Sequence, residues 1–124
     1  SLGDFQDFGE LSQQRANIAC LSNSTRGIFA GGYNPSSITD IISFITISTF
    51  GNDTDFGDLT AVRRGLAGTN NPVRGAFAGG QTPTLVNTID FITISTTGDA
   101  IDFGDLNSTK KNHAACSDAQ GGLS

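Results

Sequence analysis

The sequence contains no tryptophan and no methionine, and its 124 residues include one tyrosine, one histidine and two cysteines. With so few histidines and cysteines, no H-x-x-x-H or C-x-x-C pattern occurs, and G-x-S-x-G does not occur either, so the common motifs of zinc sites, dithiol centres and serine hydrolases are missing. His113 has no cysteine or serine partner in a recognisable arrangement. We therefore expect no catalytic role for it.

Charge and long apolar runs are also scarce. Charged residues make up 15% of the chain and the formal net charge is −5. This balance argues against a nonspecific nucleic-acid binder, because such proteins present a basic face. No apolar run approaches the roughly 20 residues that a membrane-spanning helix needs, so no membrane insertion is expected.

What the sequence has in quantity is glycine, with 16 residues, and repetition. The phrase DFGEL at 7–11 returns as DFGDL at 55–59 and 102–106, at spacings of 48 and 47 residues. Two further phrases, RGxFAGG and FITIST, each occur twice between these anchors. A fixed period in this range indicates an array of one supersecondary unit. A residue found in every repeat is therefore expected to belong to the scaffold.

One repeat, taken as residues 59–106, predicts four short strands. They are placed at 61–68, 73–78, 88–96 and 101–106. Turn signals at 69–72 (TNNP) and 97–100 (TGDA) separate strands, and Gly79 with Gly80 ends the second strand by permitting positive φ or a close backbone approach. No segment shows a sustained 3.6-residue apolar period, so a helical solenoid is not expected. The fold class predicted is all-β, with four-stranded antiparallel units of about 48 residues, the pattern of propeller blades.

The apolar residues of the repeated strands predict a core between the units. Six side chains are expected to be buried there: Phe29, Phe77, Ile45, Ile92, Phe56 and Phe103. The two cysteines, 96 residues apart, fall at the same place in two non-adjacent units. Because such positions lie farther apart than a disulfide tolerates, Cys20 and Cys116 are expected to be free and buried.

The repeat resembles the kelch motif. Kelch blades carry a glycine pair after the second strand, an aromatic residue in each of the third and fourth strands, and a basic residue that opens the next blade. In this sequence those places are filled by Gly31-Gly32 and Gly79-Gly80, Phe44 and Phe91, Phe56 and Phe103, and Arg15 with Arg63 or Arg64, then Lys110 or Lys111. The chain departs from the motif in having phenylalanine where kelch repeats have tyrosine and tryptophan. Its phrases I-x-F-I-T-I-S-T-x-G and D-F-G-D-L resemble repeats in predicted virion proteins of marine bacteriophages.

The resemblance covers nearly the whole chain and implies part of a single β-propeller. Residues 1–11 would end one blade, 12–59 and 60–106 would form two blades, and 107–124 would begin a further blade. Propellers close with roughly four to eight blades. We therefore expect either an excerpt of a longer protein or one protomer of an assembly that closes the ring.

Two motif readings compete with the scaffold reading. Asp-Phe-Gly holds magnesium in protein kinases, but here it occurs three times with no phosphate-binding loop or catalytic loop beside it. Carboxylates cluster around the same turns, at Asp4, Asp7, Glu10, Asp53, Asp55, Asp58, Asp99, Asp102 and Asp105. Calcium loops use such residues, but this spacing varies between repeats and lacks a distal bidentate carboxylate. We favour solvated turns and caps for backbone amides.

The loops after the glycine pairs are where the repeats differ most. YNPSS at 33–37 becomes QTPTL at 81–85, with a one-residue change in length. Variable loops on a rigid scaffold are common recognition sites, although unconstrained drift explains the difference equally well. We assign no catalytic, cofactor-binding or metal-binding residue, expect no cofactor, and leave the binding residues unknown.

The resemblance implies a non-enzymatic structural and interaction module in a phage virion appendage such as a tail fibre. Its partners would be proteins: other virion subunits, its own remaining blades or further protomers, with a host-surface glycan as another candidate. The expected location is the virion or the extracellular space, and no nucleic-acid partner is expected. Two alternatives stay open: a carbohydrate-binding, lectin-like propeller, and an enzyme fragment with its catalytic groups in other blades.

Overall fold

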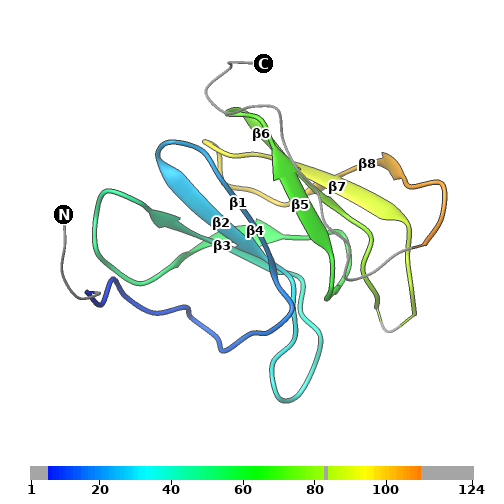
Figure 1. The fold of residues 1–124 in the computed structure, drawn as a ribbon, viewed down its shortest axis with the longest axis horizontal. Helices are drawn as coiled ribbons and strands as arrows, with labels where there is room; N and C mark the ends of the chain where they lie inside the picture. Colours follow the sequence, from blue (N-terminus) through cyan, green and yellow to red (C-terminus); the bar gives the residue numbers. More distant parts are fainter. Residues whose placement is uncertain (1–5, 83, 110–124) are drawn as a thin grey trace.

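The computed structural model describes residues 6–82 and 84–109, which fold as two four-stranded antiparallel sheets with no helix (Figure 1). Each sheet is a meander in which consecutive strands pair, in the orders β1-β2-β3-β4 and β5-β6-β7-β8. The strands are β1 (Ala19–Ser22), β2 (Arg26–Ala30), β3 (Ile41–Thr46), β4 (Thr54–Asp58), β5 (Ala67–Asn70), β6 (Arg74–Ala78), β7 (Thr88–Thr93) and β8 (Ile101–Asp105). The all-β class and the four-stranded antiparallel units are confirmed.

The two sheets have the same strand register because they are built from the same phrases. Ala19 pairs with Ala30 in the first sheet, and Ala67 pairs with Ala78 at the equivalent place in the second. A register shift occurs between the third and fourth strands of both sheets, and it leaves Phe56 and Phe103 without a direct cross-strand partner. Such a β-bulge bends the outer strand and increases its twist. The bulge is thus part of the repeat.

Two predicted strand boundaries are wrong. The first strand of the second unit is Ala67–Asn70, later than the predicted 61–68. It extends to Asn70 because the turn is formed by Asn71. The side-chain oxygen of Asn71 accepts from the N–H groups of Val73 and Arg74 at 2.8 and 2.7 Å. The third strand ends at Thr93 rather than at residue 96, because a turn follows it at once, with Thr96 N donating to Thr93 O at 3.1 Å.

The chain ahead of β5 crosses to the first sheet instead of forming a strand. Arg63 N donates to Thr39 O at 3.0 Å, and Arg63 O accepts from Gly32 N at 2.7 Å. A Cβ on Gly31 would lie 2.5 Å from Arg63 O, so this crossing needs glycine. The glycine pairs also have positive φ, +68° and +95° at Gly31 and Gly32. Both reasons given for the glycine pairs are thus confirmed.

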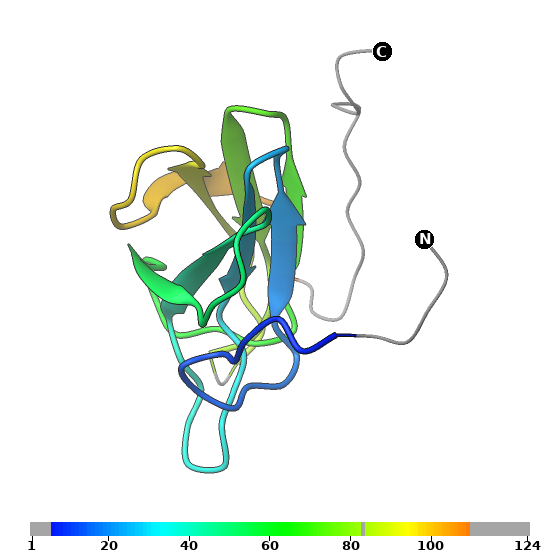
Figure 2. The ribbon, with the colours of Figure 1, turned by 90° about the vertical axis from the view of Figure 1, so that its left-hand side faces the viewer.

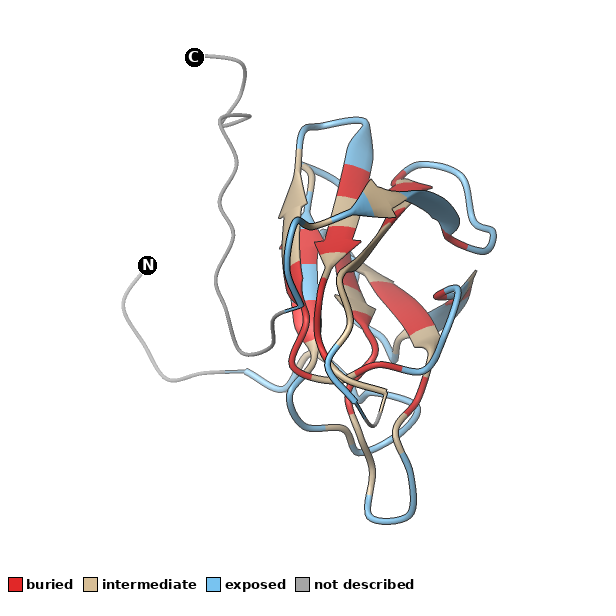
Figure 3. Ribbon diagram, turned by 90° about the vertical axis from the view of Figure 1, so that its right-hand side faces the viewer, coloured by how far each residue is buried: buried red, intermediate tan, exposed pale blue. Residues whose placement is uncertain are grey.

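The sheets pack face to face around one core. β1 lies against β5 and β6, and the sheets diverge toward β4 and β8 (Figure 2). Figure 3 shows that strands of both sheets contain buried positions. The first sheet buries Leu21, Ile28, Ile42, Phe44 and Phe56, and the second unit buries Leu66, Phe77, Ile92 and Ile94. This arrangement, with the sheets close at β1 and β5 and apart at β4 and β8, is compatible with two neighbouring blades of a propeller. The two sheets by themselves do not close a ring.

The interface uses opposite faces of the two units, and this corrects half of the predicted core. Phe56, Phe77 and Ile92 are buried as predicted. The prediction is wrong for Phe103, which is 63% exposed, whereas its equivalent Phe56 is 3% exposed. It is also wrong for Phe29 and Ile45, which are only partly buried. The reason is geometric: the first unit has its Phe56 face covered and the second unit has its Ile92 face covered, so equivalent residues differ in burial.

Cys20 is exposed, contrary to the expectation that it is buried. Its neighbours in β1, Ala19 and Leu21, point into the core, so the alternation of the strand turns Cys20 to the uncovered face. It is a free thiol, as expected. Cys116 lies outside the described residues.

Candidate functional site

The frame of the candidate site is a pair of equivalent arginines, Arg15 and Arg63. Arg63 Nη1 donates to Gly79 O at 3.0 Å and to Thr88 O at 2.9 Å. Arg15 Nη1 donates to the equivalent carbonyls, those of Gly31 at 3.2 Å and Ile41 at 2.9 Å. Each guanidinium thus ties the glycine pair to the start of the third strand. The loop between these two points is held at both ends.

The sequence left open whether Arg63 or Arg64 is the basic residue of the repeat. The hydrogen bonds show that Arg63 is the equivalent of Arg15. Arg64 instead places its guanidinium carbon 4.9 Å from the centre of the Tyr33 ring. This cation–π contact joins the second unit to the loop of the first.

The two arginines are neutralised differently. Arg63 Nη2 donates to Asp90 Oδ2 at 2.7 Å, whereas Arg15 Nη2 donates to the neutral Ser43 Oγ at 2.7 Å. Burial lowers the pKa of Arg63, and the charge and hydrogen bond of Asp90 oppose that change. Burial also lowers the pKa of Arg15, and the charge of Asp53 opposes it. In each unit a carboxylate therefore compensates the arginine, but it comes from a different segment.

The same carboxylates bind the residues that follow the first two DFG phrases. Asp90 accepts from Thr60 Oγ1 at 2.8 Å and from Thr60 N at 3.1 Å. Asp53 accepts from Ser12 N at 2.8 Å. Asp53 and Asp90 occupy different positions in the repeat. Each nevertheless compensates the charge of the arginine in its unit and caps a backbone amide.

The first variable loop, residues 33–38, is a compact turn built around Asn34. Its side-chain oxygen accepts from the N–H groups of Ser36 and Ser37, both at 2.9 Å. Asn34 N donates to Ser37 O at 2.9 Å, and Tyr33 forms backbone bridges to Ala16 and Ile38. Asparagine and proline are typical of such turns. The loop therefore has a defined shape set by its own sequence.

The second variable loop is held by different contacts. Gln81 forms backbone bridges to Arg64 and Leu85, and Thr82 N donates to Thr84 O at 2.9 Å. Val86 N closes the loop by donating to Gly80 O at 3.0 Å. Gln81 and Thr82 stand at the positions of Tyr33 and Asn34, and they build a different turn on the same frame.

A hollow of about 280 Å³ lies beside the first loop. It is lined by Gln14, Arg15, Ala16, Tyr33, Asn34 and Pro35. The guanidinium of Arg15 is engaged in the frame and the side-chain oxygen of Asn34 is engaged in its turn. The groups suited to contact a ligand are therefore the ring of Tyr33, the amide of Gln14 and the side-chain nitrogen of Asn34. An aromatic ring beside amide groups can bind a sugar or a polar peptide. The sequence drew attention to this loop but gave no sign that Gln14 adjoins it.

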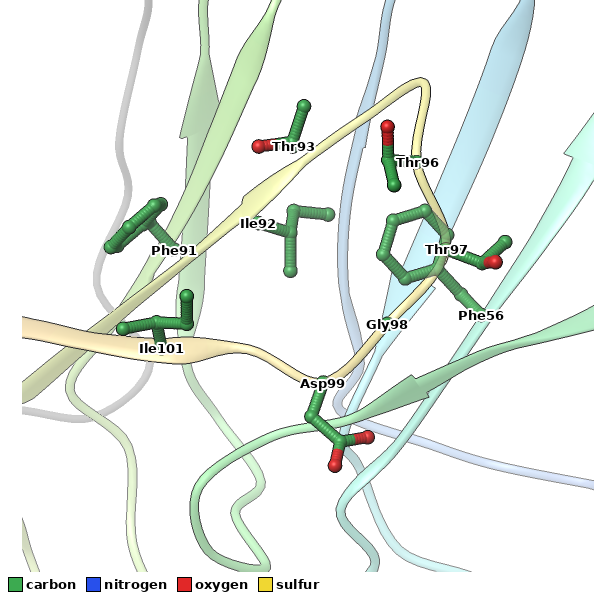
Figure 4. A pocket seen from close by; sticks show the side chains of 9 residues that line it. All are labelled: Phe56, Phe91, Ile92, Thr93, Thr96, Thr97, Gly98, Asp99 and Ile101. Atoms are coloured by element: carbon green, nitrogen blue, oxygen red, sulfur yellow. The ribbon is translucent and has the colours of Figure 1, made fainter.

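A second hollow, of about 240 Å³, lies between the sheets at the β7–β8 hairpin (Figure 4). Its lining consists of Phe56 from β4 and of residues from the hairpin itself: Phe91, Ile92, Thr93, Thr96, Thr97, Gly98, Asp99 and Ile101. An equivalent hollow occurs at the β3–β4 hairpin, lined by Thr46, Thr49, Phe50, Gly51, Asn52 and Thr54. Because it recurs at the same place in both units, this hollow is a feature of the repeat.

Two of the acidic residues near the DFG phrases, Asp53 and Asp99, cap backbone amides, and the neutral Asn52 does the same. Asp99 Oδ1 accepts from Asp58 N at 3.1 Å, and Asn52 Oδ1 accepts from Glu10 N at 3.0 Å. Within residues 6–82 and 84–109, no group of three or more His, Cys, Asp or Glu side chains is placed to hold a metal ion. Burial raises the pKa of Asp58, and the charges of Asp40, Asp99 and Asp55 raise it further.

No protein-family model matches the sequence, and no curated protein is significantly similar to it. In the part of the chain that the structure describes, no helix is long and apolar enough to cross a membrane. His113, Lys110 and Lys111 lie outside the described residues.

Proposed function

We propose that this chain is part of a kelch-like β-propeller that acts as a non-enzymatic structural and interaction module in a phage virion appendage. It would present its blade-edge loops to other virion subunits or to the host surface. The observation that carries the proposal is the contrast between frame and loop. Arg15 and Arg63 fix equivalent carbonyls in both units, while the loops between those points differ in sequence, length and hydrogen bonding.

This contrast is what a recognition scaffold requires. A loop that binds a partner must keep its shape before binding, since ordering it at the moment of binding lowers the affinity. The clamp at both ends and the turn around Asn34 supply that order. The virion assignment rests on the resemblance of the repeat phrases to phage proteins.

A carbohydrate-binding propeller is the second candidate, and the Tyr33 hollow favours it. Tyr33 offers a ring face next to the amides of Gln14 and Asn34. Against it, the equivalent position in the second unit is Gln81, so the hollow would be a single site and not one site per blade.

Immunogold labelling of phage particles with an antibody raised against this chain tests the proposal. Gold at the tail or another appendage of intact particles is the expected result, and labelling confined to unassembled material in lysed cells would contradict it. A glycan array carrying bacterial surface polysaccharides tests the second candidate. Binding that is lost in Tyr33→Ala and kept in the matched loop variant Leu85→Ala would favour the carbohydrate function.

A further inference from the structure

Backbone hydrogen bonds join the two units where the β7–β8 hairpin meets β4. The β7–β8 hairpin crosses β4, with Gly98 N donating to Phe56 O at 2.7 Å and Ala100 N donating to Asp58 O at 2.8 Å. Gly57 lies at the closest point: a Cβ on Gly57 would collide with Gly98 O. The DFG phrase of one unit is thus the receptor for the hairpin of the next.

The same contact is made a second time, by the first DFG phrase and the β3–β4 hairpin. Gly51 N donates to Phe8 O at 2.8 Å, and Asp53 N donates to Glu10 O at 3.0 Å. Here Gly9 takes the place of Gly57, and a Cβ on it would collide with Gly51 O. Residues 8–10 carry out this role without belonging to a strand.

The third DFG phrase, in β8, has the same backbone but no hairpin against it in the described part of the chain. Gly104 has φ +154°, beside +156° and +153° at Gly9 and Gly57, a region that disfavours side chains. Apart from Gly104 itself and its two chain neighbours, no described residue has an atom within 4 Å of the place where a Cβ on Gly104 would be. Around it Ile101 and Phe103 are 59% and 63% exposed. A glycine-specific backbone is therefore kept at an apolar face against which no hairpin of residues 6–82 or 84–109 packs.

We propose that this face of β8 binds the β3–β4 hairpin of a second copy of the chain. The inference deepens the proposed function by naming a partner, and it rests on the packing of the units and not on the variable loops. The β3–β4 hairpin is the fitting occupant because Gly51 and Asn52 match Gly98 and Asp99, the hairpin residues that already bind a DFG phrase.

Binding requires the second copy to exchange one DFG phrase for another. Residues 102–106 of the first copy would replace residues 7–11 of the second, which share the pattern DFGxL. The incoming phrase belongs to a four-stranded sheet, whereas the phrase it displaces is a single segment without strand pairing. The hairpin is reachable, since Phe50 is 65% exposed and Ile47 is 45% exposed.

Arg74 adds a further contact to the exchange. In the first unit Arg26 stacks on Phe44 at 4.2 Å and its Nη1 donates to Ile94 O of the second unit at 3.0 Å. Arg74 stacks in the same way on Phe91, at 5.0 Å. Its guanidinium would reach the Ile47 carbonyl of the second copy. The β8 face and the β3–β4 hairpin are different surfaces, so the copies associate head to tail. Repetition of this contact builds a closed ring or an open filament.

Light scattering of the 124-residue chain over a range of concentrations is the first test. The wild-type chain is expected to self-associate as concentration rises. Phe103→Asp should weaken this association by on the order of tenfold or more, because it places a charge at the centre of the contact. The matched control Leu85→Asp, also at an exposed apolar residue but on a loop, should not change it. Gly9→Val should strengthen it, since it releases the competing segment.

Disulfide trapping tests the geometry with both native cysteines, Cys20 and Cys116, replaced by serine. A mixture of Phe103→Cys and Phe50→Cys chains is expected to give a mixed dimer, since Phe8 already places its ring 5.5 Å from that of Phe50. Cross-linking of Phe103→Cys with itself would overturn the head-to-tail contact. A wild-type chain that stays monomeric at every concentration would overturn the proposal as a whole. Immunogold labelling of phage particles does not depend on this contact, so its result separates such a failure from a failure of the proposed function.

Discussion

Arg63 Nη2 lies 2.7 Å from Asp90 Oδ2, and both side chains are buried, with 1% and 0% exposure. This ion pair joins the crossing segment ahead of β5 to β7. It also orients the arginine toward the carbonyls of Gly79 and Thr88. The pair is therefore the structural reason that the second glycine pair and its loop occupy a fixed place.

Loss of Arg63 should destabilise the fold strongly. Arg63→Ala leaves the carboxylate of Asp90 buried without its counter-charge, and breaking such a pair typically costs about 3–5 kcal/mol of unfolding free energy. Arg15→Ala should cost less, because Arg15 is only partly buried and faces the neutral Ser43. Urea unfolding of both variants measures the difference. Equal losses would contradict the role assigned to the ion pair.

Equivalent phenylalanines should differ in their contribution to stability. Phe77→Ala should lower the unfolding free energy by about 3–5 kcal/mol, because Phe77 is fully buried. Phe103→Ala should change that free energy by no more than about 0.5 kcal/mol in the dilute chain, because Phe103 is exposed. Thermal unfolding at low concentration checks both values. A large loss in Phe103→Ala would mean that this face is covered within one chain.

Alanine substitutions at the equivalent glycines Gly57 and Gly104 should separate the cost of backbone strain from the cost of losing the contact between the units. Gly57 and Gly104 have φ of +153° and +154°, so alanine at either position is strained, at a cost on the order of 1–3 kcal/mol. Gly57→Ala should cost more than Gly104→Ala, because only its Cβ collides with the next hairpin, at Gly98 O. Chemical unfolding of the two variants gives the comparison, and a larger loss at Gly104 would contradict the described contact.

Stability should depend on pH through Asp58. Its native pKa is raised, so the folded state holds the proton of Asp58 more tightly than the unfolded state does. Ionisation of Asp58 therefore opposes folding at neutral pH, and this penalty disappears as the pH falls through the native pKa. Asp58→Asn should stabilise the protein at about pH 7 and have no effect well below pH 3.9, roughly the unfolded pKa of aspartate.

Asp105→Asn is the control for that measurement, because Asp105 holds the same place on the uncovered β8. Unfolding free energies at the two pH values, measured for wild type and both variants, suffice. Stabilisation by Asp58→Asn that is greater in acid than at neutral pH would reverse the sign of the argument.

The parts of the fold that depend on local sequence could be predicted. Repeated phrases such as RGxFAGG specify a strand and the turn that ends it, so the two sheets and the positive φ of Gly79 and Gly80 followed from the residues. Strand ends were less predictable. The turn signal TNNP predicts a turn at Asn70, because asparagine favours turns, but Asn71 forms the turn and Asn70 donates to Ser22 O across the sheets.

Burial and the candidate site could be predicted only in part. Phe56 and Phe103 stand in the same phrase, and their exposure differs because a neighbouring unit covers only one of them. No pattern within a repeat contains that information. The sequence marked the loop at Tyr33 as variable, but the contact with Arg64 joins residues of two units and depends on their packing.

Amide hydrogen exchange measured by NMR tests whether the two repeats form one structure by packing opposite faces. Gly32, Gly65 and Gly98 each donate a backbone hydrogen bond from one unit to the other, at 2.7, 3.0 and 2.7 Å. These three amides are expected to exchange as slowly as amides inside the sheets, such as that of Phe77. Rapid exchange at all three, with the sheet amides still protected, would show two independent units and would contradict the account.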